Sequence, residues 1–162
     1  MKTLSNKTTI DYFGGRFRFL SNFYPVKVEL DGVKYPTVEH AYQAAKTNSK
    51  PHRRMIERAT TPAQAKRIGK TVPLRKDWNE RRIEVMTKLI RRKFNRDELK
   101  EKLIRTGNAR LVEGNNWNDT FWGICRNVGQ NNLGKILMKV RQELKTNKAN
   151  NDATKRNKGI NE

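Results

Sequence analysis

Apolar side chains recur at helical spacing in several parts of the chain. The most regular series follows the helix-capping pattern of Asp77 and Glu80 and predicts a long helix that reaches Phe94. Thr37 and the Thr61-Pro62 pair are typical of helix starts. Shorter apolar series predict helices over about residues 38–47, 52–59, 62–69, 99–106 and 133–144. The pattern therefore predicts a mostly helical protein.

Strand patterns are fewer and shorter. Apolar and polar residues alternate from Val26 to Leu30, Asp31-Gly32 is a turn pair, and residues 33–35 predict a returning strand. Residues 11–25 predict a short strand followed by an irregular loop, and the segment ARLVEGN predicts another strand before a structured loop. The sequence thus predicts an α+β fold, a compact and mostly helical single domain with a small antiparallel β-sheet.

The length of 162 residues suits one domain. We place it at residues 11–146, after an N-terminal lead-in at residues 1–10. Residues 147–162 are polar and nearly free of apolar side chains, which predicts a disordered basic tail. This tail holds four Lys or Arg and two acids, so its net charge is +2 and about +18 of the total lies in the folded part.

The chain has 36 Lys and Arg against 16 Asp and Glu, a formal net charge of +20. Such a charge attracts polyanions, so nucleic acid or a phosphate-bearing small molecule is the expected partner, although the charge also serves solubility. With Cys125 alone, no internal disulfide is possible, and a cytoplasmic location is expected. The soft ligands are too few for a structural zinc site, and no apolar run suits a membrane span, so we expect no metal, no cofactor and no membrane contact.

One stripe of polar residues stands out on the helix after Thr37. Glu39, Gln43 and Lys46 follow at spacings of four and three residues, so they share one face of the helix. Spacing alone allows a solvated face with a weak ion-pair pattern, or a row of functional groups. His40 is equally compatible with simple packing.

The loop EGNNWNDTFWG places two carboxylates, Glu113 and Asp119, among large aromatic rings. Exposed rings are costly unless they pack or bind a flat ligand, so this loop suits a nucleobase. Alternatively, Asp119 caps a turn and Trp122 fills the core.

A third candidate lies at the start of the long helix. Arg75, Lys76 and Trp78 surround a helix N-terminus, where free amides favour anions such as phosphate. The alternative is that Asp77 is the cap, Trp78 is core and the cations are solvated. Further Lys and Arg pairs are scattered over several helices and predict a general positive field.

Seven segments, in order along the chain, resemble the NADAR family of YbiA-like proteins. They are FLSNFYP, DGVKYPTVEHAYQAAK, AKRIGK, LRKDW, the VM…L…KF series, LVEGNNWNDTFWG and NNLGKILMKVR. The similarity extends from about Asp11 to Leu144. It implies a compact α+β fold and N-glycosidase activity. Some members cleave ribosylamino-pyrimidine phosphates of the riboflavin pathway, and others remove ADP-ribose from guanine in nucleic acid.

The resemblance also implies site residues. The functional acid of the EH helix falls on Glu39, the aromatic of the DW segment on Trp78, and the aspartate of the DxxWG segment on Asp119. We expect Glu39 and Asp119 to be the catalytic acid/base pair, without assigning either role. The substrate-binding set is completed by six further residues: Lys46 and Arg75 for phosphate, Gln43, Trp122, Asn22 and Phe23.

Cleavage of a ribosyl C–N bond passes through an oxocarbenium-like state, which needs a carboxylate near the anomeric carbon and a proton or hydrogen bond for the leaving base. The expected function is removal of ADP-ribose from ADP-ribosylated guanine in nucleic acid, which the basic surface would bind. Two alternatives stay open. One is cleavage of riboflavin-pathway intermediates, and the other is a non-catalytic module that binds ADP-ribose or nucleic acid. The sequence leaves the oligomeric state undetermined.

Overall fold

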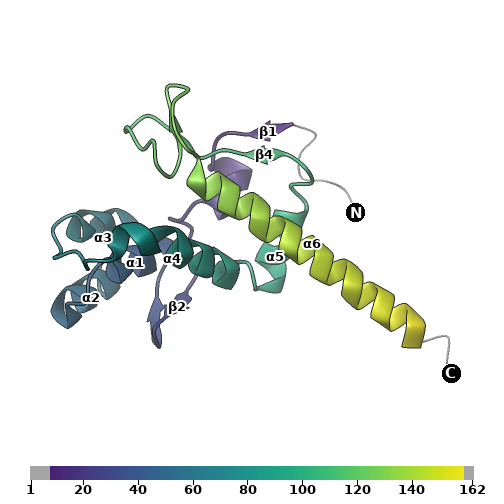
Figure 1. Cartoon of the computed structure of the whole chain (residues 1–162), viewed down its shortest axis with the longest axis horizontal. Coiled ribbons are helices and arrows are strands. Elements are labelled where there is room, and N and C mark those ends of the chain that lie inside the picture. The colour runs from purple at the N-terminus through teal and green to yellow at the C-terminus, as the bar shows by residue number, and fades with distance from the viewer. Residues whose placement is uncertain (1–7, 159–162) are drawn as a thin grey trace.

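The structure, a computed structural model, describes residues 8–158 and has a mostly helical architecture with short strands (Figure 1). The helical elements are η1 (a 3₁₀ helix, Gly15–Leu20), α1 (Val38–Ala45), α2 (Lys50–Glu57), α3 (Pro62–Gly69), α4 (Trp78–Lys93), α5 (Asp97–Ile104) and α6 (Asn132–Lys158). The strands are β1 (Thr9–Ile10), β2 (Val28–Leu30), β3 (Val33–Tyr35), β4 (Arg110–Leu111), β5 (Gly114–Asn115) and β6 (Ile124–Cys125). The α+β class predicted from the sequence is confirmed.

Helix α1 lies at the centre of the molecule. It contacts α2, α3, α4 and both strands of the β2–β3 hairpin, and every one of its residues is buried. Thr37 caps it as predicted, because the Thr37 hydroxyl accepts a hydrogen bond from the His40 amide. His40 is a packing residue: its Nδ1 lies 2.8 Å from the Thr37 hydroxyl and its Nε2 lies 3.0 Å from the carbonyl oxygen of Ala59.

The predicted hairpin is present as the antiparallel pair β2–β3, in which Val28 faces Tyr35 and Leu30 faces Val33. Its two turn residues, Asp31 and Gly32, have φ values of 51° and 79°. Two consecutive positive φ angles match the twist of a tight hairpin, which explains the Asp-Gly sequence.

Two further strand pairs differ from the predicted antiparallel sheet, since β1–β4 and β5–β6 are parallel. β1 lies inside the predicted lead-in, and Ile10 is part of the core. The strand expected in residues 11–25 is instead the 3₁₀ helix η1, which begins at Gly15 with a φ of 53°. Its alternating Phe17 and Phe19 are buried, and so short an alternation suits a 3₁₀ turn as well as a strand.

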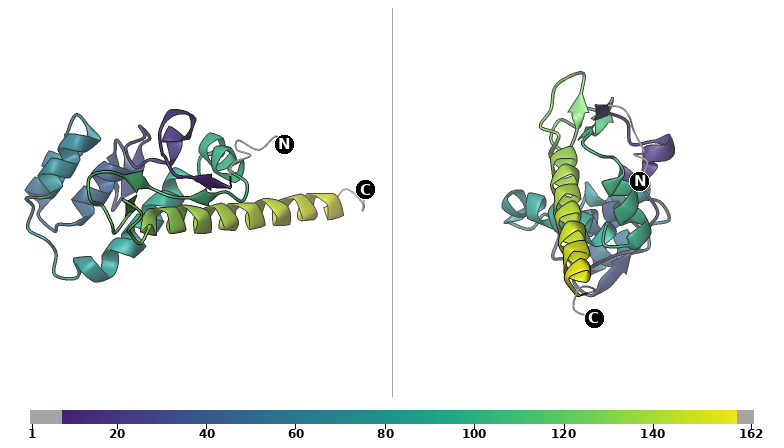
Figure 2. Two further views of the ribbon diagram at one scale, coloured as in Figure 1. Left: turned by 90° about the horizontal axis from the view of Figure 1, so that it is seen from above. Right: turned by 90° about the vertical axis from the view of Figure 1, so that its right-hand side faces the viewer.

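Helix α6 is the longest element and projects from the body of the molecule toward the C-terminus (Figure 2). Its first half packs on α4, α5 and β4 and buries Leu133, Leu137 and Val140. The helix continues to Lys158. The prediction of disorder is therefore wrong for residues 147–158, which are helical. Residues 159–162 of the predicted tail, like residues 1–7 of the lead-in, lie outside the described part of the chain.

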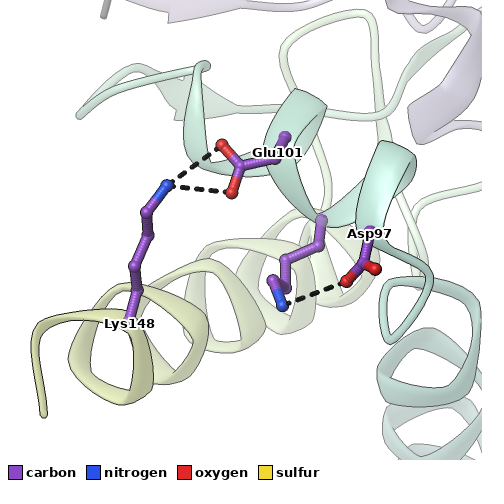
Figure 3. A network of polar contacts seen from close by, with 4 residues as sticks. Asp97, Glu101 and Lys148 are labelled. Atoms are coloured by element: carbon purple, nitrogen blue, oxygen red, sulfur yellow. Dashed lines mark hydrogen bonds and ion pairs between the residues drawn. The ribbon is translucent and has the colours of Figure 1, made fainter. Parts of the chain in front are cut away.

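A tertiary contact extends the anchoring of α6 beyond its apolar stretch. The Lys148 amine donates hydrogen bonds of 2.9 and 3.2 Å to the two carboxylate oxygens of Glu101 on α5, one turn after Asp97 (Figure 3). Local sequence pattern cannot reveal such a contact.

Over residues 8–158, no helix has both the length and the apolar character that a membrane crossing requires.

Candidate active site

A cavity of about 670 Å³ is enclosed by α1, α3, α4, the aromatic segment 12–23 and the loop 113–122. This volume lies within the range of about 300 to 1,000 Å³ that is usual for small-molecule sites. Eight of the nine predicted site residues line it: Glu39, Asp119, Trp78, Lys46, Gln43, Trp122, Asn22 and Phe23. The folded chain therefore brings together residues that are distant in sequence.

Glu39 and Gln43 form the wall contributed by α1. Gln43 Nε2 donates a 2.7 Å hydrogen bond to Glu39 Oε1, and both residues are buried. Burial raises the pKa of Glu39 above its ordinary value, against the opposing effects of the Gln43 hydrogen bond and of Lys66 and Lys46. The polar stripe is thus not a solvated face, because a central helix buries both of its sides.

Gly69 allows α3 to approach this wall closely. A side-chain carbon at position 69 would collide with Oε1 of Gln43. The glycine therefore brings α3, which carries Lys66 and Lys70, next to the polar stripe of α1.

Asp119 fits both interpretations made from the sequence. Its Oδ1 accepts a 2.8 Å hydrogen bond from the Trp122 amide, which makes it a turn cap, and it also lines the cavity. Asn115 fixes it further, because the Asn115 side chain accepts a hydrogen bond from the Asp119 amide and donates one to its carbonyl oxygen. The carboxylate is consequently held by a network of local bonds.

Four aromatic rings that contact one another line the cavity. Tyr42 lies between Trp78 and Trp122, with ring-centre distances of 5.2 and 5.4 Å. Phe121 packs edge-on against Trp122 at 4.8 Å. Trp78 and Tyr42 are both buried, so these rings form a rigid wall.

Asn22 and Phe23 contribute to the cavity wall from the segment before the β2–β3 hairpin. The backbone carbonyl of Asn22 accepts a hydrogen bond of 3.1 Å from the Glu39 amide, which ties this segment to the start of α1. Asn22 Nδ2 contacts the sulfur of Met86 at 3.5 Å. Its Oδ1 is buried without a hydrogen-bond partner in the described part of the chain and is available to a ligand.

Arg75 is the one predicted site residue that lies outside the cavity. Its guanidinium binds the Asp77 carboxylate at 2.6 and 3.1 Å, and its backbone amide donates to the carbonyl oxygen of Lys46. The arginine lowers the pKa of Asp77. Asp77 is at the N-cap position, yet its side chain makes no capping hydrogen bond. Arg75 therefore has a carboxylate partner outside the cavity, and phosphate binding at this helix start stays a prediction.

Three basic residues that the sequence analysis counted only toward the overall positive charge also line the cavity. Lys66 of α3, Lys70 at the C-cap of α3 and Arg82 of α4 join Lys46 around the cavity, and we call these four residues the basic rim. The Arg82 guanidinium stacks on Phe121 with its carbon 3.5 Å from the ring centre, and its Nε is buried without a partner in residues 8–158. Burial lowers the pKa of Lys46, and the neighbouring charges of Lys66 and Lys70 act in the same direction.

Glu113 is the acid that the sequence noted in the aromatic loop but left out of the site. It lines the cavity with Glu39 and Asp119, and we call these three residues the carboxylate cluster. Burial, followed by the charges of Asp119 and Glu39, raises the pKa of Glu113 to about 8. Trp117 and Tyr12 also line the cavity and are 58% and 71% exposed, which places apolar rings at its mouth.

Comparisons with known proteins agree with this geometry. The NADAR domain family matches residues 12–145. N-glycosidase YbiA of Shigella boydii is 40% identical over 128 residues, which cover 76% of this chain and 79% of that protein. A riboflavin biosynthesis protein of Vibrio vulnificus is 39% identical over 130 residues, which cover 78% of this chain and 35% of that protein.

A solved structure supports the same relationship. The NMR structure of the Escherichia coli protein YbiA matches with a TM-score of 0.78 and 36% sequence identity over 90% of each chain. Fold, cavity and relatives together define an enzyme of the N-glycosyl hydrolase class. The chain belongs to the NADAR family.

Proposed function

We propose that this N-glycosidase removes ADP-ribose from ADP-ribosylated guanine in nucleic acid. The observation that carries the proposal is the meeting of the carboxylate cluster and the basic rim in one cavity. Carboxyl groups suit the glycosidic bond, and cations suit a diphosphate. A substrate that carries both features in one molecule matches this arrangement.

The reaction assigns the acid/base work to Glu39 and Asp119. The bond between the anomeric carbon and the leaving nitrogen breaks, its electron pair passes to the nitrogen, and an oxocarbenium-like ribosyl group develops. One carboxyl group of the pair protonates the leaving nitrogen. The other takes a proton from water, whose oxygen bonds to the anomeric carbon. The charges of Glu39 and Asp119 influence each other, which supports a shared role at one reacting bond.

The basic rim supplies the contacts for the phosphates. Lys66 of α3 and Lys70 at its C-cap are about one helical turn apart, and Arg82 of α4 also lines the cavity. The unpartnered Nε of Arg82 is a buried donor that a phosphate oxygen would satisfy. Lys46 also lines the cavity, and its positive charge acts to lower the pKa of Glu39.

Net charge favours a polymeric substrate. A charge of +20 exceeds what a free nucleotide needs and gives a broad field for a polyanion. Trp117 at the cavity mouth, with the Lys66 amine 5.8 Å from its ring centre, offers a stacking surface for a base of that polymer.

A second substrate is favoured by the names of two relatives. The proteins of Vibrio vulnificus and Zea mays that match this chain are named riboflavin biosynthesis proteins. A ribosylamino-pyrimidine phosphate has a glycosidic C–N bond and a phosphate, so it needs the same two groups of residues. It lacks the polymer that the net charge favours.

A substrate panel separates these possibilities. The purified chain is incubated with an ADP-ribosylated guanine oligonucleotide in DNA and RNA form and with a ribosylamino-pyrimidine phosphate, and released ribosyl product is measured. We expect release of ADP-ribose from an oligonucleotide, lost in Glu39→Gln and Asp119→Asn while oligonucleotide binding persists. Matched controls are Glu84→Gln and Asp97→Asn, because both residues are exposed and neither lines the cavity.

Each contrary result has a defined meaning. Turnover of the pyrimidine phosphate alone would replace the proposed substrate with the riboflavin intermediate. Tight binding of ADP-ribosylated DNA and RNA with no release from any member of the panel would favour the non-catalytic binding module and contradict the proposal.

A further inference from the structure

Glu113 lines the cavity, and its backbone is held by hydrogen bonds on both sides. It connects β4 to β5, its amide donates to Asn131 Oδ1 at 3.1 Å, and its carbonyl oxygen accepts from the Ile124 amide at 2.9 Å. These bonds anchor the residue from two directions. The backbone of Glu113 is therefore fixed beside the cavity.

Glu113 is half-buried, and its Oε2 is inaccessible to solvent and has no hydrogen-bond partner within the described chain. A buried polar atom without a partner is costly, so its presence at a cavity wall indicates a ligand that supplies the partner. Glu39 and Asp119, in contrast, already accept hydrogen bonds from Gln43 Nε2 and the Trp122 amide. Glu113 thus differs from the other two members of the carboxylate cluster.

The charges around Glu113 favour its neutral form. Asp119 of the same loop and Glu39 of α1 both oppose its ionisation, and Lys66 of α3 favours it. With a pKa of about 8, the carboxyl group carries its proton at neutral pH. A protonated carboxyl group donates a hydrogen bond, which a carboxylate cannot do.

We propose that Glu113 is a third catalytic residue, a neutral carboxylic acid whose O–H donates a hydrogen bond to the base as it leaves. This inference rests on the proposed function, since it requires a base to leave. The electron pair of the broken C–N bond passes to the leaving nitrogen, and the resulting charge spreads into the ring. Glu113 keeps its proton and stabilises that charge, while the Glu39–Asp119 pair transfers the protons of hydrolysis.

Two substitutions separate donation from packing. Glu113→Gln keeps the size and a donor but does not titrate, whereas Glu113→Ala removes the donor. We expect Glu113→Ala to lose about 10²- to 10³-fold in kcat, the usual effect of deleting a transition-state hydrogen bond, and Glu113→Gln to keep most activity at pH 7. Glu84→Gln serves as the matched control, because Glu84 is exposed and does not line the cavity.

The pH profile gives the decisive comparison. Wild-type kcat should fall as pH rises through about 8, where Glu113 loses its proton, and this alkaline loss should be absent in Glu113→Gln. An equal loss in Glu113→Gln and Glu113→Ala, with the alkaline limb of the remaining activity unchanged, would overturn the inference. Circular dichroism melting of each variant shows whether it is folded.

A direct titration keeps the inference testable if no substrate is cleaved. The ¹³C shift of the Glu113 carboxyl carbon, assigned by its absence in Glu113→Gln, should titrate near pH 8. Titration near the ordinary pKa of about 4.3 would overturn the neutral-acid role. Titration near 8 without turnover of any substrate would support the protonation state while contradicting the proposed function.

Discussion

The carboxylate cluster and the basic rim share one cavity but differ in their exposure to solvent. Glu39 is buried, and an oxygen of Glu113 is inaccessible to water, whereas Lys66 is half-buried and Lys70 is exposed. Burial disfavours charge on Glu39 and Glu113, whereas Lys66 and Lys70 of the rim stay in contact with solvent. We infer that the acids act on the reacting bond and that the cations capture and orient its phosphates.

The largest effect should follow a change in the buried acid. Glu39→Gln removes a carboxyl group of the acid/base pair and should lower kcat by about 10²- to 10⁴-fold with little change in KM. Single-turnover rates with saturating substrate measure this loss. A comparable loss in Glu84→Gln, or a change confined to KM, would contradict the division of roles.

A smaller effect of a different kind should follow a change in the basic rim. Lys66→Gln should raise KM about 10-fold and leave kcat nearly unchanged, because a phosphate contact worth about 1.4 kcal/mol corresponds to a factor of 10. Arg67→Gln is a close control, since Arg67 is the next residue on α3, is exposed and does not line the cavity.

Salt concentration sharpens the same comparison. The KM of the wild type for an oligonucleotide should increase with salt, and the slope should be smaller in Lys66→Gln. An equal dependence of KM on salt in the wild type and Lys66→Gln would contradict a phosphate contact of Lys66. A fall in kcat with no change in KM would indicate that Lys66 acts in the chemical step together with the carboxylates.

Helix positions were predictable because apolar periodicity is a local property. Predicted and observed helices agree within a few residues at α1, α3 and α4. Burial of Glu39 and Gln43 was not predictable, because it depends on packing against both sides of α1. The same limit applies to β1 and β4, whose two-residue pairing joins Thr9 to Arg110 across the chain.

The site was predicted in part, for a related reason. Motif resemblance located Glu39, Trp78 and Asp119, all of which line the cavity. Lys66 and Arg82 each lie beside another basic residue, and only the tertiary fold determines which member of each pair faces the cavity. Arg75 lies outside the cavity, and the sequence does not reveal its bidentate bond to Asp77.

The stability of the folded chain should depend on pH because of Glu113 in the carboxylate cluster. The pKa of Glu113 is raised in the folded state, so the unfolded chain releases this proton at lower pH than the folded chain does. Wild-type stability should therefore decrease between about pH 4.5 and 8, and Glu113→Gln should remove that contribution. Each pH unit corresponds to at most about 1.4 kcal/mol, so Glu113→Gln should raise Tm at pH 8 by an amount that thermal melting resolves.

Thermal melting at pH 5 and pH 8 checks this expectation. The difference in Tm between Glu113→Gln and the wild type should be larger at pH 8 than at pH 5. A Tm difference that is the same at both pH values would mean that Glu113 is not protonated abnormally in the folded protein. Glu84→Gln, whose side chain is exposed, should show no such trend.

The smallest effect is expected for a cation that is remote from the cavity. Lys148→Ala removes the bonds to Glu101, in which the two side chains are 37% and 33% exposed, so the loss should be about 0.2 to 1 kcal/mol in the free energy of unfolding. Amide exchange should increase in α6 beyond residue 146, where this contact anchors a polar helix, and kcat and KM should not change. A rise in KM like that of Lys66→Gln would extend the substrate-binding surface from the basic rim to α6. An unchanged KM would show that position at the cavity, and not positive charge alone, determines the function of the rim.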